Sequence, residues 1–462
     1  MVETITLFGR KVSVLGDWDT VVIGGGAAGF SAALSSAQSG LRTVIVEKSI
    51  RLGGTAVNAL VTPMMPSWTG HRENFFAVEE KLQEIGVKTR DDLNSAYLWF
   101  SPEALSTAYE TLYLNAQGHI LYDTDVIDAV VEDSKIVAVL VKTVEGIGAI
   151  RAKYFVDASG DLVLARSINV ATTHGDDQGN NQMSSLRFEM GGIDVERYRA
   201  YLVSLNDRFS KFNAGGDFYE SAMVGGGDFV LEPLFKRGIE QGLLQTKDLR
   251  YYQTFTLPGK PGCMSFNCPH LAELKDNTSA LARSCAVSEG HQMINRLVNF
   301  LQRMMPGFEN SFLLQEASML GIRESYRLVG QLVLTEDNYT NQSRFSDGIA
   351  RGDWYIDVHS VTKGLFHQNT YKEGDYYEIP YRSMVTDEIA NIIVAGRCIS
   401  ANFLMQASIR ITPTCIDMGQ AVGEAIVLAK QLGKPLNRLN GGLLKERMNY
   451  YQSVEEAKNH TA

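Results

Sequence analysis

The chain has 462 residues, of which 45% are hydrophobic and 21% charged, and this composition excludes a disordered chain. Its length predicts two or three domains that could enclose a large cofactor. A net charge of −10 and a pI near 5.4 argue against a broad surface for nucleic acid or anionic membrane, and no apolar run reaches membrane-spanning length. We expect a cytoplasmic protein that acts on a small molecule and binds neither nucleic acid nor membrane.

The first predicted elements are a small hairpin and a βαβ unit. The segment ITLFGRKVSVLG, residues 5–16, is typical of two short strands around Gly9 and Arg10. An apolar run from Val21 to Ile23 then leads into a glycine turn, an alanine-rich helix and a second strand over residues 43–46.

The glycine turn has the spacing of a dinucleotide-binding motif. Gly24, Gly26 and Gly29 follow the first strand, and Glu47 ends the next strand, eighteen residues after Gly29. The first glycine permits a tight turn, the second permits close approach of a pyrophosphate, and the third permits close helix packing. We expect the helix N-terminus to bind phosphates and Glu47 to accept hydrogen bonds from an adenosine ribose.

Further small-residue turns favour flavin over nicotinamide. Gly53 and Gly54 follow Glu47, and the last of several predicted strands in residues 117–158 runs into Asp157-Ala158-Ser159-Gly160-Asp161. Because FAD lies extended across its domain, an FAD site should show several places where the backbone comes close to the cofactor.

The composition changes between about residues 187 and 375, which predicts an inserted domain. It contains an amphipathic helix with Ile294, Leu297 and Leu301 on one stripe. It also contains Cys263 and Cys268, either a redox pair or metal ligands, or strand residues that point to opposite faces. The strand over residues 391–396 then predicts a return to the first domain.

Several motifs together resemble the FAD-dependent oxidoreductase family allied to the flavoprotein subunits of succinate dehydrogenase and fumarate reductase. They are the first glycine motif with Glu47, GGT at 53–55, DASGD at 157–161, GIRESYRLVG at 321–330, IPYRSM at 379–384, and VAGRCIS at 394–400 through GQAVGEA at 419–425. The resemblance implies an α/β fold: a discontinuous, Rossmann-type, glutathione-reductase-like FAD-binding domain with an inserted α+β substrate domain. The predicted parts are residues 1–186 and 376–435 for the FAD-binding domain, 187–375 for the insertion and 436–462 for a tail.

The same resemblance implies which residues contact FAD. The segment GGTAVNALV offers no histidine for a covalent flavin linkage, so we expect noncovalent FAD. The implied contacts are Gly24, Gly26, Ala27, Ala28, Gly29, Glu47, Lys48, Gly53, Gly54, Thr55, Val126, Ala158, Ser159, Gly160, Asp161, Gly396, Arg397, Gly419, Gln420 and Ala421.

Arg410 stands just before a helix predicted to face the flavin ring. Pro413 suits the first turn of that helix and Thr412 suits its cap. A helix N-terminus there would stabilise negative charge on the reduced ring. Arg410 could bind a substrate carboxylate, polarise a carbonyl, donate a proton or form a structural salt bridge.

Other candidates for the chemistry lie in the later segments. His359, His270 and His367 could take a proton from a substrate hydroxyl or amine. Arg323 could act on the substrate or form a structural network with Glu324 and Arg327. The remaining candidates are Tyr381 and Arg382.

Together these features predict an oxidoreductase that transfers hydride between a small organic substrate and flavin N5. Oxidation at a C–OH or C–N bond would favour a histidine base, whereas reduction or formation of a C=C bond would favour an arginine or tyrosine donor. The alternative is a flavoprotein with structural or redox-neutral FAD. The sequence predicts no metal site and leaves open whether the chain forms a homo-oligomer.

Overall fold

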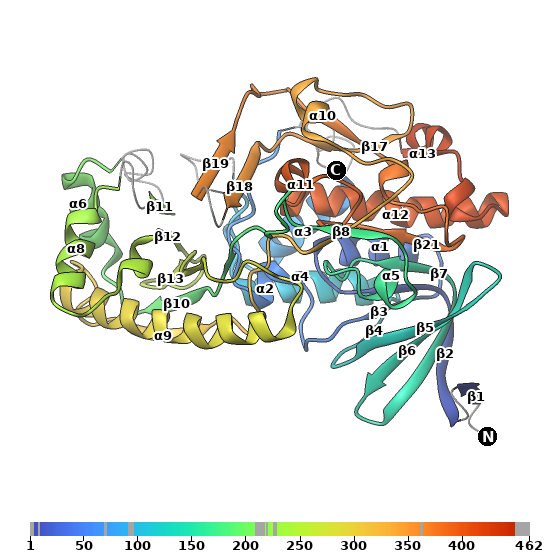
Figure 1. Cartoon of the computed structure of the whole chain (residues 1–462), viewed down its shortest axis with the longest axis horizontal. Helices are drawn as coiled ribbons and strands as arrows, with labels where there is room; N and C mark the ends of the chain where they lie inside the picture. Colours follow the sequence, from blue (N-terminus) through green and yellow to red (C-terminus); the bar gives the residue numbers. More distant parts are fainter. Residues whose placement is uncertain are drawn as a thin grey trace.

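The computed structural model describes residues 4–7, 10–68, 72–90, 97–207, 218, 220–224, 229–360 and 364–448. Its largest sheet has eight strands in the order β4-β3-β2-β7-β6-β5, with β1 paired to β2 and β21 paired to β7 (Figure 1). Their bounds are β1 Thr4–Leu7, β2 Arg10–Ile23, β3 Thr43–Val46, β4 His119–Leu121, β5 Asp125–Glu132, β6 Lys135–Thr143, β7 Gly146–Asp157 and β21 Ile392–Val394. The Rossmann-type α/β fold is therefore confirmed.

Strand β2 is one continuous strand of 14 residues. Its first half pairs antiparallel with β1, as the predicted hairpin requires, and its second half pairs parallel with β3. Strand β7 runs beside both halves, with a bulge between Val14 and Gly16. The second strand of the predicted hairpin and the strand that enters the glycine turn are thus one element, β2.

Helices α1 and α12 pack against each other over the large sheet, one from each end of the sequence (Figure 1). The helices are α1 Ala27–Gln38, α2 Thr55–Asn58, α3 Glu73–Glu84, α4 Pro102–Asn115, α5 Val163–Ser167, α6 Val195–Ser204, α8 Glu232–Glu240, α9 Ala280–Met304, α10 Glu336–Thr340, α11 Phe403–Ile409, α12 Thr412–Leu432 and α13 Gly441–Met448. Short 3₁₀ turns are η1 Thr246–Leu249, η2 Tyr381–Ser383 and η3 Leu436–Arg438.

A second sheet of five strands, ordered β11-β12-β13-β10-β15, lies with the long helix α9 at the left of Figure 1. Its strands are β10 Phe188–Gly191, β11 Glu220–Val224, β12 Tyr251–Thr256, β13 Met264–Phe266 and β15 Phe312–Glu316. Two-stranded pairings join β8 Thr172–His174 to β16 Tyr326–Leu328, β9 Ser184–Ser185 to β14 His270–Leu271, β17 Gly348–Gly352 to β20 Tyr377–Pro380 and β18 Ile356–Ser360 to β19 Gly364–Gln368.

Two large hydrophobic cores and two small clusters hold the buried apolar side chains of the described residues. The sheet core gathers buried side chains of residues 21–170 and 328–448, and the distal core gathers Leu60 with residues 186–322. The sequence placed the end of the insertion at residue 375, yet Ile349 and Val358 belong to the sheet core. The reason is that β17 packs against α12 and α13.

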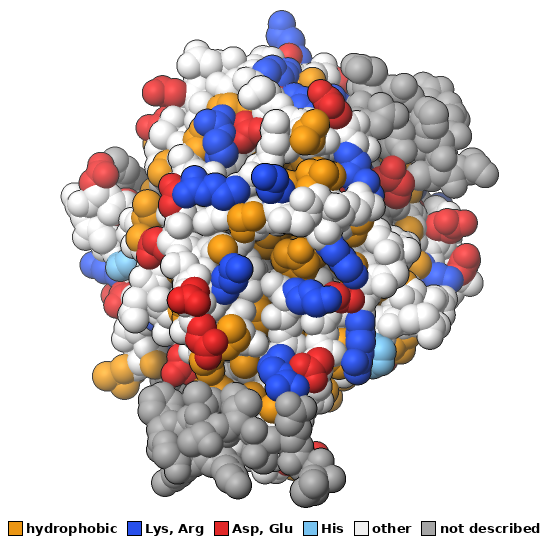
Figure 2. Space-filling view, turned by 90° about the vertical axis from the view of Figure 1, so that its right-hand side faces the viewer, with side chains coloured by type: hydrophobic (Ala, Val, Ile, Leu, Met, Phe, Trp, Pro, Cys, Tyr) orange, Lys and Arg blue, Asp and Glu red, His pale blue; other side chains and the backbone are white. Residues whose placement is uncertain are grey.

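The surface mixes charges of both signs. Figure 2 shows basic and acidic side chains interspersed on the face seen from the right-hand side of Figure 1. Within the described ranges, no helix is long and apolar enough to cross a membrane.

Candidate cofactor and substrate site

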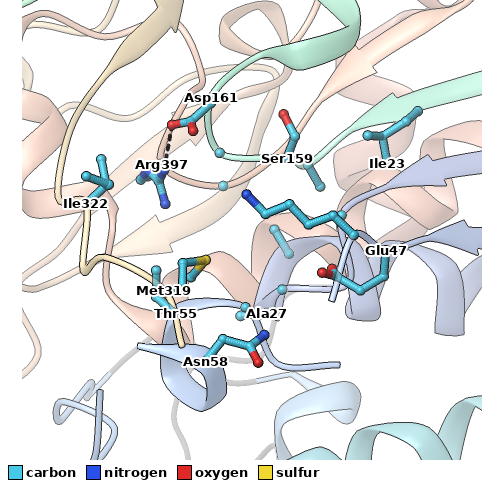
Figure 3. Close-up of a pocket in the computed structure, with 18 of the residues that line it drawn as sticks. Ile23, Ala27, Glu47, Thr55, Asn58, Ser159, Asp161, Met319, Ile322 and Arg397 are labelled. Atoms are coloured by element: carbon cyan, nitrogen blue, oxygen red, sulfur yellow. Dashed lines mark hydrogen bonds and ion pairs between the residues drawn. The ribbon is translucent and has the colours of Figure 1, made fainter. Parts of the chain in front are cut away.

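A cavity of about 360 Å³ lies at the edge where the parallel strands of the large sheet end. The loops after β2, β3, β7 and β21 line it, beginning with Gly24, Glu47, Ala158 and Ala395. Figure 3 shows Ala27, Glu47, Ser159 and Arg397 from these segments around it. Open α/β sheets bind ligands at this edge, because the chain leaves adjacent strands there and opens a crevice.

Most of the residues predicted to contact a cofactor line this cavity. They are Gly24, Gly26, Ala27, Ala28, Glu47, Lys48, Gly53, Gly54, Thr55, Val126, Ala158, Ser159, Gly160, Asp161, Gly396 and Arg397. Gly29 does not line it, because a Cβ at Gly29 would lie 1.8 Å from the carbonyl oxygen of Gly24. The absence of a side chain at Gly29 lets α1 pack closely against the glycine turn that precedes it.

The glycine turn leaves backbone donors free to face the cavity. Gly24 has a φ of +92°, and a Cβ there would clash with the backbone of Ala158, so the position has no room for a side chain. Gly26 precedes α1 and makes no side-chain cap, so the first N–H groups of α1 are not satisfied by a side chain. Such a helix N-terminus binds phosphate through these donors and its dipole.

Glu47 is fixed at the end of β3 by two backbone donors. Its Oε2 accepts the N–H of Gly25 at 2.7 Å, and its Oε1 accepts the N–H of Ser49 at 2.9 Å. The side chain is buried and points toward the cavity beside the glycine turn (Figure 3). It therefore holds the position predicted for the ribose acceptor.

Three further groups meet at Asp161, on the other side of the cavity. Arg397 Nη2 and Arg283 Nη1 each lie 2.9 Å from one oxygen of Asp161, and Ser325 donates to that carboxylate at 2.6 Å. Burial opposes ionisation, but these two guanidinium groups hold the pKa of Asp161 far below its usual range. The result is a pair of cations fixed on the wall of the cavity.

The N-terminus of α12 also reaches the cavity, where Arg410, Thr412 and Cys415 line it. The cap residue is Ile411, without a side-chain hydrogen bond, so the prediction that Thr412 caps the helix is wrong. Thr412 is already helical, since Pro413 occupies the first turn. Free N–H groups at this end favour negative charge in the cavity.

Gly419, Gln420 and Ala421 lie farther along α12 and do not line the cavity. Gly419 faces α1, and Gln420 bonds to Glu73 and to the N–H of Asn74. The small residues of this segment serve helix packing instead of cofactor contact.

A cluster of histidines and arginines, here called the histidine cluster, adjoins the cavity through Arg410. It comprises His270 from β14, His359 and Asp357 from β18, Tyr251 from β12, Arg323 and Arg410. The two histidines and the tyrosine are buried, and the other three side chains are partly exposed. The imidazoles of His270 and His359 lie with ring centroids 5.1 Å apart, and Tyr251 stacks on His270 at 4.1 Å.

Two contacts connect the histidines to the arginines. Arg323 Nη2 lies 3.2 Å from His270 Nε2. Arg410 Nη2 donates to the carboxylate of Asp357 at 3.2 Å, and the other oxygen of Asp357 lies 3.4 Å from His359 Nε2. Because Arg410 also lines the cavity, the cluster adjoins the cofactor space.

Both imidazoles are neutral at pH 7. Burial, reinforced by the charge of Arg323, lowers the pKa of His359 to about 4 and that of His270 well below 6.5. Burial and the charge of Arg410 also lower the pKa of Arg323, but a guanidinium titrates so high that it stays charged. The cluster thus combines neutral bases with cations.

A sequence model of the family described as "FAD dependent oxidoreductase" matches residues 19–448. The chain belongs to this family. FAD is the cofactor of this oxidoreductase, and the cavity fits it: the glycine turn and the bare N-terminus of α1 suit a pyrophosphate, and Glu47 suits a ribose.

Curated relatives of the oxidoreductase match over limited segments. The dihydrolipoyl dehydrogenase of Schizosaccharomyces pombe is 47% identical over 57 residues, which are 12% of this chain and 11% of that enzyme. The thiamine thiazole synthase of Aeropyrum pernix is 28% identical over 169 residues, which are 32% of this chain and 57% of that protein. The matches thus cover about a tenth of the dehydrogenase and a little over half of the synthase.

Among solved structures, a geranylgeranyl bacteriochlorophyll reductase-like protein of Thermoplasma acidophilum superposes with a TM-score of 0.48. The sequence identity is 12%, and the superposition covers 96% of this chain and 95% of that one.

Other predicted residues lie away from the chemistry of the oxidoreductase. Tyr381 donates to the carbonyl of Leu436 within the sheet core, and Arg382 pairs with Asp347 at 2.8 Å; neither lines the cavity. The sequence assigned them from the IPYRSM motif, whereas their partners are Leu436 in η3 and Asp347 before β17. The side chain of His367 lies outside the described residues.

Two further groups have structural roles. Glu324 and Arg327 form a buried ion pair in the network that the sequence allowed for. Cys263 precedes β13 and Cys268 follows it in the sequence, and both are free thiols. Within the described ranges, no group of three His, Cys, Asp or Glu side chains could hold a metal ion.

The sequence did not single out Asp357, Tyr251 or Arg283. Asp357 stands two residues before His359, so both lie on one face of β18, and that alternation was the available signal. Tyr251 and Arg283 carry no local signal, because their partners come from distant segments of the chain.

Proposed function

We propose that this FAD-dependent oxidoreductase transfers a hydride between a small organic anion and N5 of the flavin. Bound FAD supplies the two-electron acceptor or donor. The histidine cluster carries the proposal, since it brings two neutral bases and two cations to the border of the cofactor cavity.

The charges of the cluster favour an anionic substrate. Arg323 and Arg410 bring two positive charges, and Asp357 brings one negative charge to Arg410. Arg323 forms no salt bridge with a carboxylate in the part of the chain that the structure describes; it donates to the carbonyl of Met183. A guanidinium that forms no salt bridge and lies beside neutral imidazoles favours a carboxylate ligand, which it binds through two parallel donors.

The protonation state of the cluster favours oxidation of a C–OH or C–N bond over formation of a C=C bond. A neutral imidazole with a depressed pKa can accept the proton that leaves as hydride departs from carbon. Formation of a C=C bond would favour an arginine or tyrosine donor, but the candidate tyrosine, Tyr381, does not line the cavity.

Alliance with the flavoprotein subunits of succinate dehydrogenase and fumarate reductase stays a prediction, since none of the relatives described above is such a subunit. So do noncovalent attachment of FAD and a cytoplasmic location. A structural or redox-neutral FAD remains the competing hypothesis that the following experiment tests.

The holoenzyme is mixed anaerobically with a panel of hydroxy acids, amino acids and saturated acids, and loss of the oxidised flavin absorbance is followed. We expect at least one member to reduce the flavin. Arg410→Gln should keep FAD and lose most of this reduction, because it removes the cation of the histidine cluster that lines the cavity. Arg382→Gln, which breaks a remote ion pair, serves as the control. Absence of reduction by every member would refute hydride transfer from a small organic acid.

A further inference from the structure

We infer that Arg283, from the long helix α9, binds the diphosphate of the dinucleotide cofactor, so that the part of the chain built around the distal core supplies one of the cofactor's contacts. The inference concerns how FAD is held. It stands whether or not the oxidoreductase takes hydride from a small organic acid.

One face of helix α9 runs from the cofactor cavity into the distal core. Arg283 and Val287 lie four residues apart on this face, near the start of the helix, and both line the cavity. The same face continues with Ile294, Leu297 and Leu301, whose side chains are buried in the distal core. The first turns of α9 therefore close the cavity, and its later turns anchor the helix.

The guanidinium of Arg283 is held in place by two contacts. Its Nε donates to the carbonyl of Asn277 at 2.6 Å, and its Nη1 lies 2.9 Å from Oδ2 of Asp161. These contacts leave Nη2 without a hydrogen-bond partner among the described residues. A fixed cation with a spare donor thus stands on the wall of the cavity.

The carboxylate that holds Arg283 belongs to a turn that packs on the glycine turn. Asp161 comes three residues after Ala158, and a Cβ at Gly24 would lie 2.8 Å from the carbonyl oxygen of Ala158. The two turns therefore meet backbone to backbone at the edge of the cavity.

Arg397, the second cation on Asp161, is connected to the start of α1. It directly follows Gly396, whose Cβ would lie 3.2 Å from the Cβ of Ala28 in the first turn of α1. Figure 3 shows Asp161 and Arg397 on one side of the cavity and Ala27, the first residue of α1, on the other. A diphosphate bound at the N-terminus of α1 would thus face the arginine pair across the cavity.

The charges of this group favour an anionic ligand over a neutral one. The pKa of Asp161 lies far below its usual range, so one carboxylate faces two guanidinium groups at pH 7 and a positive charge remains. A guanidinium binds phosphate oxygens through charge-assisted hydrogen bonds. The uncapped N–H groups of α1 supply further donors to the same anion.

Ligand binding to the full chain after removal of FAD tests this contact without any turnover. Arg283→Gln should raise the dissociation constant of FAD by about tenfold or more, because a charge-assisted hydrogen bond to phosphate is lost. ADP should compete with FAD less well by a similar factor, whereas adenosine, which lacks the diphosphate, should compete as it does with the wild type. Arg296→Gln is the matched control, since it breaks another ion pair of α9, with Asp248, at a residue that does not line the cavity.

An unchanged dissociation constant of FAD in Arg283→Gln would overturn the inference. Equal weakening of ADP and adenosine would also overturn it, because Arg283 would then only hold α9 in place. If Arg283→Gln does not fold, ³¹P NMR of the holoenzyme with Arg283→Lys decides the question. The diphosphate resonances of FAD should shift in Arg283→Lys and stay in place in Arg296→Lys, and unshifted resonances in Arg283→Lys would refute the contact.

Discussion

A Cβ at Gly419 would lie 2.2 Å from the carbonyl oxygen of Ala28, so α12 and α1 approach each other backbone to backbone. The contact repeats one turn later, where a Cβ at Gly423 would lie 2.8 Å from the carbonyl of Ala32. Two helices from opposite ends of the sequence are therefore held together by residues that have no side chain.

Gly419→Ala should destabilise the fold by more than about 2 kcal/mol, because the added methyl group meets backbone that cannot move aside. The free energy of unfolding in urea measures this loss. Gly442→Ala is the control, since its Cβ would meet the side-chain oxygen of Asn440 at 3.1 Å and the carbonyl oxygen of Ser346 at 3.5 Å, an ordinary contact distance. Equal stability of the two variants would contradict the packing of α12 on α1.

Gly26 and Gly29 should respond differently to substitution. A Cβ at Gly26 would lie 3.7 Å from the Cα of Gly54, so Gly26→Val should fold and lose FAD because its side chain enters the phosphate space. Gly29→Ala should unfold the turn itself, given the 1.8 Å approach to Gly24. The ratio of flavin to protein absorbance and the melting temperature separate the outcomes. If Gly26→Val stays fully yellow, the phosphate site is assigned wrongly.

Asp161→Asn should destabilise the protein by about 3 kcal/mol and weaken FAD retention, because Arg283 and Arg397 lose their shared counter-charge. Asp17→Asn removes an exposed partner of Arg151 and should cost at most about 1 kcal/mol. Urea unfolding of both variants at pH 7 gives the comparison. A small loss for Asp161→Asn would mean that the two arginines are satisfied without it.

Stability should fall as the pH decreases below about 6.5. The pKa of His359 is about 4 in the folded protein and near 6.5 when unfolded. Between these values the unfolded chain binds a proton that the native state does not, so each pH unit costs up to about 1.4 kcal/mol for this residue. The contribution is fully present above pH 6.5 and decreases toward pH 4.

Unfolding measured between pH 7.5 and pH 5 checks this dependence. His359→Gln should reduce the slope of stability against pH, and His291→Gln, which changes a half-exposed side chain, should keep it. An unchanged slope in His359→Gln would show that His359 titrates normally in the native state.

The sequence predicted the elements and site residues that depend on neighbours close together in the chain. Gly24, Gly26 and Glu47 lie in one βαβ unit, so their spacing alone predicted one nucleotide site, and all three line the same cavity. The strands of residues 117–158 and the helix around Leu297 followed equally from periodicity, and β21 returns to β7 as predicted.

The errors concern partners that are distant in the chain. Gly419 has the composition of a ligand turn, but only the position of α1 shows that it packs against a helix. Tyr381 and Arg382 were assigned by a motif, whereas their partners Leu436 and Asp347 decide their roles. The link between Asp357 and Arg410 joins segments 53 residues apart, which no local pattern records.

Strand β21 and helix α12 complete a site whose first part is made by residues 24–29. During translation, the glycine turn and α1 therefore leave the ribosome long before the residues that close over them. Until α12 emerges, the face of α1 on which it packs stays uncovered. The cavity is complete only when the residues that follow β21 have joined the glycine turn.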